Sequence, residues 1–298
     1  VSNREGYYSN QTTVTGLKPQ TTYAYQIVSG DLKSEVYTFT TGGSGDFSFA
    51  YVGDPQIGAG SLPDKGLSGW ANTLNIIAEN SIFNGTSFLL SAGDQVNTDD
   101  SESEYDGYLE HDPLKHLPAA TVIGNHDSDS NAYDQHFNAA NESAEYGVTQ
   151  AGGDSYFVYN NVLFMVINAN DASNSEHRKF MEDAIKATAD QNIKWKVVAF
   201  HQSVFSVANH STSDGIVSKR NELAPILKEL DIDVVLMGHD HSYCRTYMMD
   251  GLTPITESDK YEYDNGTDQA PTTVNDPEGI LYVTANSGSG SKTYNIVN

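Results

Sequence analysis

Short runs of apolar residues recur along the chain, and five of them lead directly into clusters of Asp, Asn or His. Residues 47–52 precede Gly53-Asp54, for example, and residues 233–237 precede Gly238-His239. Runs of this length and character are typical of buried strands. In an open α/β sheet, residues that follow the strands gather outside the carboxyl ends of those strands. The order of the clusters therefore predicts one shared site.

Other segments predict further strands and the helices between them. Additional strands are expected at residues 87–91, 120–123, 162–167, 196–200 and 280–284, and residues 156–161 read as a hairpin partner with a turn at Asn160-Asn161. Apolar residues at helical spacing predict three amphipathic helices. Their stripes are Leu74, Ile76, Ile77 and Ile82; Phe180, Met181, Ile185 and Ala189; and Leu223, Ile226, Leu227 and Leu230. Strands that alternate with helices indicate an α/β fold.

The first 41 residues have a different pattern. Short alternating strands are expected at residues 12–19, 21–28 and 35–40, with a turn at Gly30-Asp31. The Leu-x-Pro-x-Thr-x-Tyr-x-Tyr pattern from Leu17 to Tyr25 resembles the later strands of a fibronectin type III-like domain. We therefore expect the C-terminal part of such a β-sandwich at residues 1–41, a linker at 42–46, and a second domain at 47–298.

Composition restricts the classes of partner. The formal charge is −24, from 16 basic and 40 acidic residues. Such a surface argues against binding to a nucleic-acid scaffold, which requires clustered Lys and Arg. No apolar stretch approaches the length of a membrane span, and the single cysteine, Cys244, excludes an internal disulfide.

Localisation is expected to be extracellular or at the cell surface. Abundant Tyr, Asn, Thr, Ser and Gly with few Lys are typical of secreted bacterial proteins. No signal peptide stands at Val1 and the chain opens within a strand-like segment, so we expect residues before Val1 in the natural protein.

The clusters have the chemistry of a two-metal site. Two cations about 3.5 Å apart need a bridging carboxylate with oxygen and imidazole ligands on each side. We expect Asp94 to bridge, Asp54 and His241 to hold the first metal, and Asn125, His201 and His239 to hold the second. His126 would then face the substrate, where it could stabilise charge or protonate the leaving group. His210 lies on a loop that could also contact substrate, although a surface role is equally consistent with the sequence.

Five motifs together resemble those of the calcineurin-like metallophosphoesterases. They are Gly53-Asp54, Gly93-Asp94, Gly124-Asn125-His126-Asp127, Phe200-His201 and Gly238-His239-Asp240-His241. The fibronectin-like segment before them is similar to that of the purple acid phosphatases. The resemblance implies a four-layer α/β/β/α sandwich, two divalent or trivalent ions (Fe, Mn or Zn), and hydrolysis of small phosphate esters by a metal-bound hydroxide.

Two positions depart from the family pattern. Purple acid phosphatases carry a tyrosine three residues after the bridging aspartate, where this chain has Asn97. Many other members carry a histidine two residues after the first aspartate, where this chain has Gln56. Gln56 or Asn97 could add a neutral oxygen to the first metal. We therefore predict a colourless protein with a labile first metal.

Three functions are compatible with these residues. Hydrolysis of phosphate monoesters, as by an acid phosphatase, is the expected activity. A phosphodiesterase or nucleotidase could use the same metal core, and no motif separates these activities. A cell-surface binding module with a weakened metal site is the third alternative, suggested by Gln56, Asn97 and the fibronectin-like segment.

Overall fold

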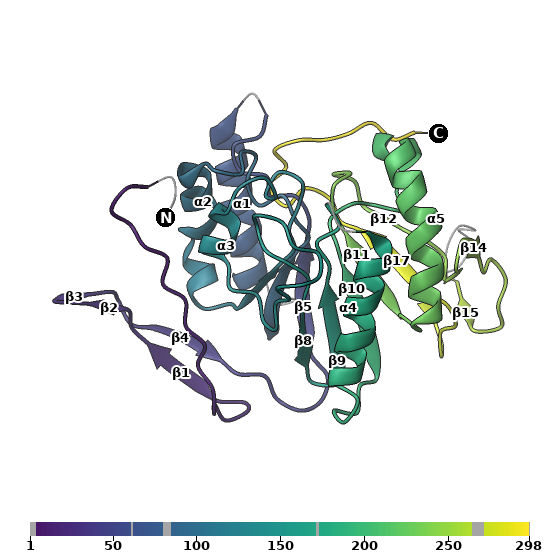
Figure 1. Cartoon of the computed structure of the whole chain (residues 1–298), viewed down its shortest axis with the longest axis horizontal. Helices are drawn as coiled ribbons and strands as arrows, with labels where there is room; N and C mark the ends of the chain where they lie inside the picture. The colour runs from purple at the N-terminus through teal and green to yellow at the C-terminus, as the bar shows by residue number, and fades with distance from the viewer. Residues whose placement is uncertain (1–3, 61, 80–84, 171–172, 264–270, 298) are drawn as a thin grey trace.

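Two β-sheets lie face to face in the middle of the molecule, and helices cover both outer faces (Figure 1). The computed structural model describes residues 4–60, 62–79, 85–170, 173–263 and 271–297. The layers follow the order helix, sheet, sheet, helix, so the predicted α/β architecture is confirmed.

The smaller sheet has three parallel strands in chain order. They are β5 (Ser48–Val52), β6 (Thr86–Ser91) and β7 (Ala119–Thr121). The larger sheet has six strands, of which the four central ones are parallel and the two edge strands antiparallel. Its order is β12 (Cys244–Arg245), β17 (Leu281–Thr284), β11 (Val234–Met237), β10 (Trp195–Ala199), β9 (Val162–Val166) and β8 (Ser155–Tyr159).

Helices follow the strands in the alternation that the sequence predicts. They are α1 (Pro63–Glu79), α2 (Glu102–Leu109), α3 (Ala132–His136), α4 (Asn174–Ala187) and α5 (Asp214–Glu229), with 3₁₀ turns η1 (Asp112–Lys115) and η2 (Asn209–Thr212). Two small hairpins follow β12. They pair β13 (Met249–Asp250) with β14 (Thr253–Pro254), and β15 (Tyr261–Glu262) with β16 (Thr273–Val274).

The alternation of side chains along β6 explains the layered core. Phe88 and Leu90 point between the two sheets, where they join a buried cluster with Phe164 of β9. Leu89 points to the opposite face and packs with Trp70 of α1. Successive residues of a strand face opposite sides of a sheet, so a continuous apolar run serves both cores at once.

The helical stripes are confirmed for most residues. Leu74 and Ile77 of α1 are buried, whereas Ile76 is 45% exposed because it lies on the other side of the same helix. Ile82, also expected in this stripe, lies outside the described residues. Among the described residues, no helix is both long and apolar enough to cross a membrane.

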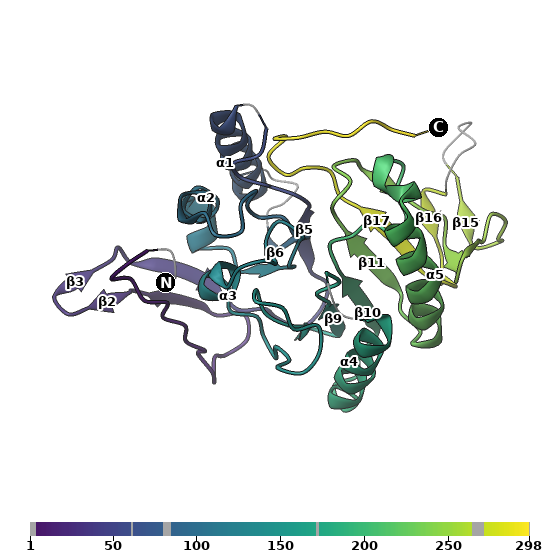
Figure 2. The same ribbon diagram turned by 45° about the horizontal axis from the view of Figure 1, so that its top comes forward.

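The N-terminal segment forms two small β-hairpins. Strand β1 (Thr22–Tyr25) pairs with β4 (Tyr37–Thr40), and β2 (Val28–Ser29) pairs with β3 (Leu32–Lys33) around the predicted turn. The expected strand at residues 12–19 is wrong, since the backbone there has no strand. The hairpins project to one side (Figure 2), and Leu32 at their tip is 77% exposed, because no second sheet covers them within the described residues.

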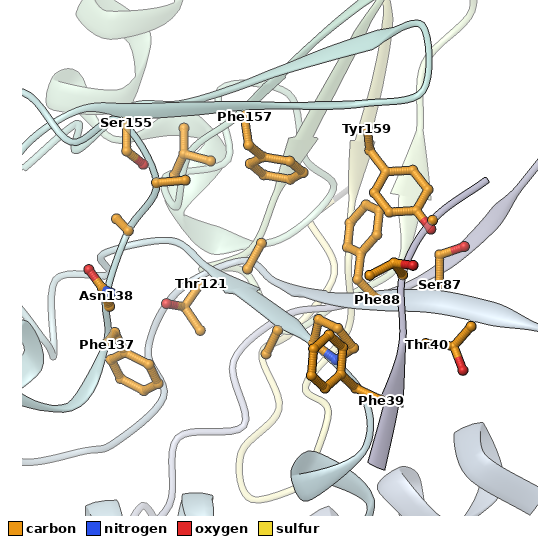
Figure 3. Close-up of a pocket in the computed structure, with 18 residues that line it drawn as sticks. Phe39, Thr40, Ser87, Phe88, Thr121, Phe137, Asn138, Ser155, Phe157 and Tyr159 are labelled. Carbon is orange, nitrogen blue, oxygen red and sulfur yellow. The ribbon is translucent and has the colours of Figure 1, made fainter. Parts of the chain in front are cut away.

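A cavity of about 400 Å³ lies where hairpin β1–β4 meets the open side of the two sheets (Figure 3). Phe39 of β4, Phe88 of β6, and Phe157 and Tyr159 of β8 form part of its wall. Phe88 lies near the start of β6, at the opposite end of the strand from Asp94. The cavity is therefore separate from the polar clusters.

Candidate metal centre

The five polar clusters meet at one edge of the sandwich, as the sequence predicts. Each follows the carboxyl end of a strand, namely β5, β6, β7, β10 or β11. The loops after β5 and β6 run side by side, because the N–H of Asp54 donates to the carbonyl of Gly93 (3.2 Å) and the N–H of Gln56 to that of Asp94 (2.8 Å). Chain segments far apart in sequence thus form one wall.

Asp94, His201 and His239 form the centre of this site. One potential ligand atom from each lies within 4.8 Å of the other two. Nε2 of His201 lies 3.2 Å from a carboxylate oxygen of Asp94 and 3.2 Å from Nδ1 of His239. Imidazole nitrogens and a carboxylate at this separation could hold a transition metal ion.

Asp54 and His241 provide a neighbouring position. Nε2 of His241 lies 3.3 Å from Oδ1 of Asp54, and the same oxygen lies 3.8 Å from Nε2 of His201. The main-chain N–H of His239 also donates to the Asp54 carboxylate, at 2.8 and 3.0 Å from its two oxygens. Asp54 is therefore fixed beside the cluster of Asp94, His201 and His239. This cluster and the Asp54–His241 pair could hold two adjacent metal ions.

Main-chain carbonyls orient two of the imidazoles. Nδ1 of His201 lies 2.8 Å from the carbonyl oxygen of Ala92, and Nδ1 of His241 lies 2.9 Å from that of Lys292. In a neutral imidazole whose Nδ1 donates to a carbonyl, Nε2 carries no proton and can bind a metal. No motif points to Lys292, which lies 51 residues after His241.

The backbone of the candidate ligands is held in an uncommon conformation. Asp54 (φ 47°), Gln56 (39°), Asp94 (51°), His239 (71°) and His241 (46°) all have positive φ. Non-glycine residues rarely adopt this region, and such residues cluster at functional sites.

The glycines before the ligands make room for them. A Cβ on Gly93 would lie 2.3 Å from Nδ1 of His201, and one on Gly124 would lie 2.2 Å from Oδ1 of Asp94. The Gly-Asp and Gly-Asn motifs therefore have a steric basis, since the ligand side chains pack directly on the glycine backbone.

Electrostatics indicate that the site needs a positive charge. Burial disfavours a charged imidazole, but Asp94 outweighs it and raises the pKa of His201 to about 10. Burial also opposes ionisation of Asp94, yet His201 lowers the pKa of Asp94 to about 2. Burial raises the pKa of Asp54, while burial followed by repulsion from His201 lowers the pKa of His239 to about 2. Metal ions can supply the charge that a proton on His201 provides here.

Asn125 and His126 lie on the loop after β7. The main-chain N–H of His126 donates to Oδ1 of Asp94 (2.9 Å), which places this loop against the centre. Nδ1 of His126 lies 2.7 Å from the carbonyl oxygen of Asn97. The Asn125 side chain is exposed, so the structure brings its backbone to the site without burying its amide.

Asp127 holds the same loop in place, a role that the sequence did not reveal. One carboxylate oxygen accepts the N–H of Gln95 (3.1 Å) and the other accepts that of Gly124 (2.8 Å). Burial, reinforced by Asp94, raises the pKa of Asp127 to about 8. The residue therefore links the loops that carry Asp94 and Asn125.

His210 lies at the site, where a contact with substrate requires it to be. Its ring centroid is 4.4 Å from that of His239, and its Nδ1 lies 2.6 Å from Oδ1 of buried Asp240. Tyr294 packs edge-on against His210 (4.8 Å between centroids) and against His241 (4.9 Å). Tyr294 comes from the last residues of the chain, and no motif pointed to it.

Gln56 and Asn97 are neighbours in the structure. The amide nitrogen of Gln56 lies 3.3 Å from Oδ1 of Asn97. Gln56 is completely buried, and its amide oxygen has no hydrogen-bond partner among the described residues. The two positions where the chain departs from the family pattern are thus in contact.

Comparison with known proteins matches most of the chain to one family. Residues 47–243, more than half of the chain, match the family described as calcineurin-like phosphoesterase. Among curated proteins, an uncharacterized protein of Mycobacterium tuberculosis is 33% identical over 107 residues, covering 32% of this chain and 20% of that protein. Purple acid phosphatase 17 of Arabidopsis thaliana is 32% identical over 82 residues, covering 28% of this chain and 23% of that protein. The matches thus span about a fifth of the length of these relatives.

Solved structures share the fold at low sequence identity. A purple acid phosphatase from yellow lupin seeds superposes with a TM-score of 0.65 at 18% identity, covering 94% of this chain and 52% of that one. A dimetal phosphatase from Danio rerio gives a TM-score of 0.53 at 12% identity, covering 81% of this chain and 88% of that one. At these identities the likeness concerns the fold alone.

Proposed function

The chain belongs to the calcineurin-like phosphoesterases, and we propose on this basis that it hydrolyses small phosphate monoesters at a pair of metal ions. The observation that carries the proposal is the convergence of Asp54, Asp94, His201, His239 and His241 at one edge of the sandwich. The name of one similar protein, purple acid phosphatase 17 of Arabidopsis thaliana, supports a phosphatase activity.

The donor set fits two metal ions. Asp94 and Asp54 are buried carboxylates with imidazole nitrogens at 3.2 and 3.3 Å, and two rings present Nε2 because carbonyls hold Nδ1. We assign Asp54 and His241 to the first ion, His201 and His239 to the second, and Asp94 to both. Asn125 would complete the second position through its side-chain oxygen. When bound, such ions polarise the phosphoryl group and make water more nucleophilic.

Two histidines are placed to act on the substrate. His126 is held through Nδ1 by the carbonyl of Asn97, which leaves Nε2 to donate a proton to the departing alkoxide. His210 is held through Nδ1 by Asp240, and its Nε2 can donate a hydrogen bond to a phosphoryl oxygen. Both roles require a proton on Nε2 while Nδ1 makes its own hydrogen bond.

A panel of substrates tests this function. The stripped protein, reloaded with Mn²⁺, Zn²⁺ or Fe²⁺, should hydrolyse 4-nitrophenyl phosphate faster than bis(4-nitrophenyl) phosphate, and Asp94→Ala should abolish both activities. Asp100→Ala, an exposed carboxylate on the following loop, serves as the matched control and should retain activity. Faster turnover of the diester or of a nucleotide would instead identify a phosphodiesterase or nucleotidase. Absence of all turnover with two ions bound would favour a binding module.

Localisation and domain organisation belong to the same proposal. We propose that the protein acts outside the cell or at its surface, and that residues 1–41 are the end of a fibronectin type III-like domain joined at residues 42–46 to the catalytic domain at 47–298. The antiparallel pairing of β1 with β4 supports the second point. Cell fractionation tests the first proposal, and a protein that stays inside the cell would contradict it. A structure of a longer natural chain tests the second, and the absence of a sandwich before residue 42 would contradict it.

A further inference from the structure

Gln56 has an amide oxygen that nothing in the described structure satisfies. The side chain is 0% exposed, and Oε1 has no hydrogen-bond partner. A buried polar atom without a partner is costly and calls for a specific explanation. The residue also has φ of 39°, so its backbone is held in a conformation that the surrounding loops must impose.

The position of Gln56 is fixed by the two loops that carry Asp54 and Asp94. The N–H groups of Asp54, Gln56 and Ile57 donate in turn to the carbonyls of Gly93, Asp94 and Gln95, at 3.2, 2.8 and 3.1 Å. Gln56 therefore lies directly across from Asp94 and two residues after Asp54. These are the two carboxylates assigned to the first ion.

Asn97 sets the orientation of the Gln56 amide. Its Oδ1 lies 3.3 Å from Nε2 of Gln56, and an asparagine Oδ1 can only accept. The NH₂ group of Gln56 is thereby directed at Asn97, so Oε1 is the atom left for another partner. Asn97 itself is anchored, because its main-chain N–H donates to a carboxylate oxygen of Glu104 (2.9 Å).

Gln95 shows that a buried glutamine in this loop need not face the site. Its Oε1 also lacks a partner, but its NH₂ group lies 3.3 Å from the carbonyl of Val122 and 3.4 Å from the hydroxyl of Ser91. These partners belong to the ends of β6 and β7, and Gln95 is directed into the sheet. The contact with Asn97 distinguishes Gln56.

We propose that Oε1 of Gln56 is a ligand of the first metal ion and that Asn97 holds it in place for this purpose. The inference rests on the proposed two-metal function and adds a residue to it. With Gln56 the first ion has one imidazole, two carboxylates and a neutral oxygen. Neutral oxygen and imidazole ligands suit Mn²⁺, Fe²⁺ or Zn²⁺, and two carboxylates, one of them shared, do not balance a trivalent ion. The first position therefore selects a divalent cation.

Metal binding to single variants tests the proposal without recourse to activity. Protein stripped with a chelator is titrated with Mn²⁺, bound metal is counted by mass spectrometry, and electron paramagnetic resonance distinguishes a coupled Mn²⁺ pair from an isolated ion. Gln56→Met is similar in length but has no donor oxygen. This variant should bind one of the two Mn²⁺ ions at least about 10-fold more weakly, and the signal of the coupled pair should disappear. Gln56→Glu should keep both equivalents, and the matched control Gln95→Met should also keep both.

Retention of two equivalents with unchanged affinity in Gln56→Met would overturn the proposal. If that variant does not fold, Asn97→Ala provides a second route, since it leaves Gln56 intact but frees its amide. Asn97→Ala should bind the same metal ion about 10-fold more weakly, and an unchanged affinity would likewise overturn the proposal. Wild-type protein offered Fe³⁺ should remain colourless and retain less than one equivalent at the first position, whereas tight retention of Fe³⁺ there would contradict a site selective for divalent cations.

The outcomes separate this proposal from the proposed function. If wild-type protein binds two ions but hydrolyses no ester, the function is wrong and the role of Gln56 is still decided by the titration. If hydrolysis is observed and Gln56→Met keeps both ions, only the role of Gln56 is wrong. If wild-type protein binds no ion at all, both fail.

Discussion

Nδ1 of His210 lies 2.6 Å from Oδ1 of Asp240, a carboxylate that is fully buried between two candidate metal ligands. This contact explains why the central residue of the Gly-His-Asp-His motif is an aspartate although it is not a ligand. The carboxylate fixes the ring of His210 beside His239, where a phosphate ester would bind.

Replacement of Asp240 should separate substrate binding from metal binding. In Asp240→Asn the hydrogen bond to the carboxylate that fixes the ring of His210 is lost, so kcat/KM for a phosphate monoester should fall about 10-fold or more while two metal ions remain bound. Steady-state kinetics and metal analysis of the same preparations measure this. Asn209→Ala, an exposed neighbour of His210, is the control. Loss of metal from Asp240→Asn would show that Asp240 supports the ligands and not the substrate.

His126 should affect the chemistry of the leaving group. His126→Ala should lower kcat about 100-fold for an alkyl phosphate, whose alkoxide needs a proton, because general acids contribute about 10²- to 10⁴-fold. The loss should be much smaller for 4-nitrophenyl phosphate, whose leaving group is stable without a proton. Metal content should stay unchanged. Equal losses for both substrates, or loss of metal, would contradict a role as general acid.

Metal removal should destabilise the fold. Asp54 and Asp94 are buried carboxylates, and a bound cation offsets the cost of burying them together. Adding Mn²⁺ to stripped protein at about 100 times its Kd should raise the free energy of unfolding by about 2.7 kcal/mol, measured by chemical denaturation. Asp94→Ala should respond much less. An equal response in that variant would place the stabilising metal elsewhere.

Two glycines with nearly the same φ allow the cost of backbone strain to be measured separately from the cost of a steric clash. Gly93 (φ +92°) faces the ring of His201, whereas Gly85 (φ +95°) faces open space. Gly85→Ala should cost about 1–3 kcal/mol of unfolding free energy through backbone strain alone. Gly93→Ala should cost more, and only this variant should also weaken metal binding. Denaturation curves and metal titrations of both variants test the difference, and similar metal affinities would contradict direct packing of His201 on Gly93.

Tyr294 should act through its ring. Its contacts with His210 and His241 are between rings, so Tyr294→Phe should behave like wild type. In Tyr294→Ala both imidazoles lose packing on one side, and KM for a monoester should rise several-fold. An effect of equal size in Tyr294→Phe would instead assign a role to the hydroxyl group.

Much of this arrangement could be predicted from sequence because local patterns encode it. The apolar run that contains Leu89 and Leu90 fixes a strand, and the Gly-Asp that follows fixes the position of a ligand. Residues 12–19 misled the prediction, because an alternating pattern forms a strand only where a partner strand is present. The exposure of Ile76 was not predicted, because the apolar stripe of α1 is wider than the face that this helix buries.

Other parts of the site depend on contacts that no local pattern records. The carbonyl of Lys292 orients His241, yet any residue type could supply a carbonyl there. The pairing of Gln56 with Asn97 joins positions 41 residues apart, and each substitution alone looks like a lost ligand. Only the folded arrangement shows that the two side chains meet.

The hydrogen bond from His241 to the carbonyl of Lys292 also has a consequence for biosynthesis. The ligands assigned to the second ion, Asp94, His201 and His239, have all been translated once residue 239 is made, but the ring of His241 cannot be oriented until Lys292 has left the ribosome. Strand β17 and the pairing of Gly53 with Ser287 impose the same delay on the loop of Asp54. A nascent chain would thus acquire its two metal positions in order, and the first position would form only when synthesis of this region is nearly finished.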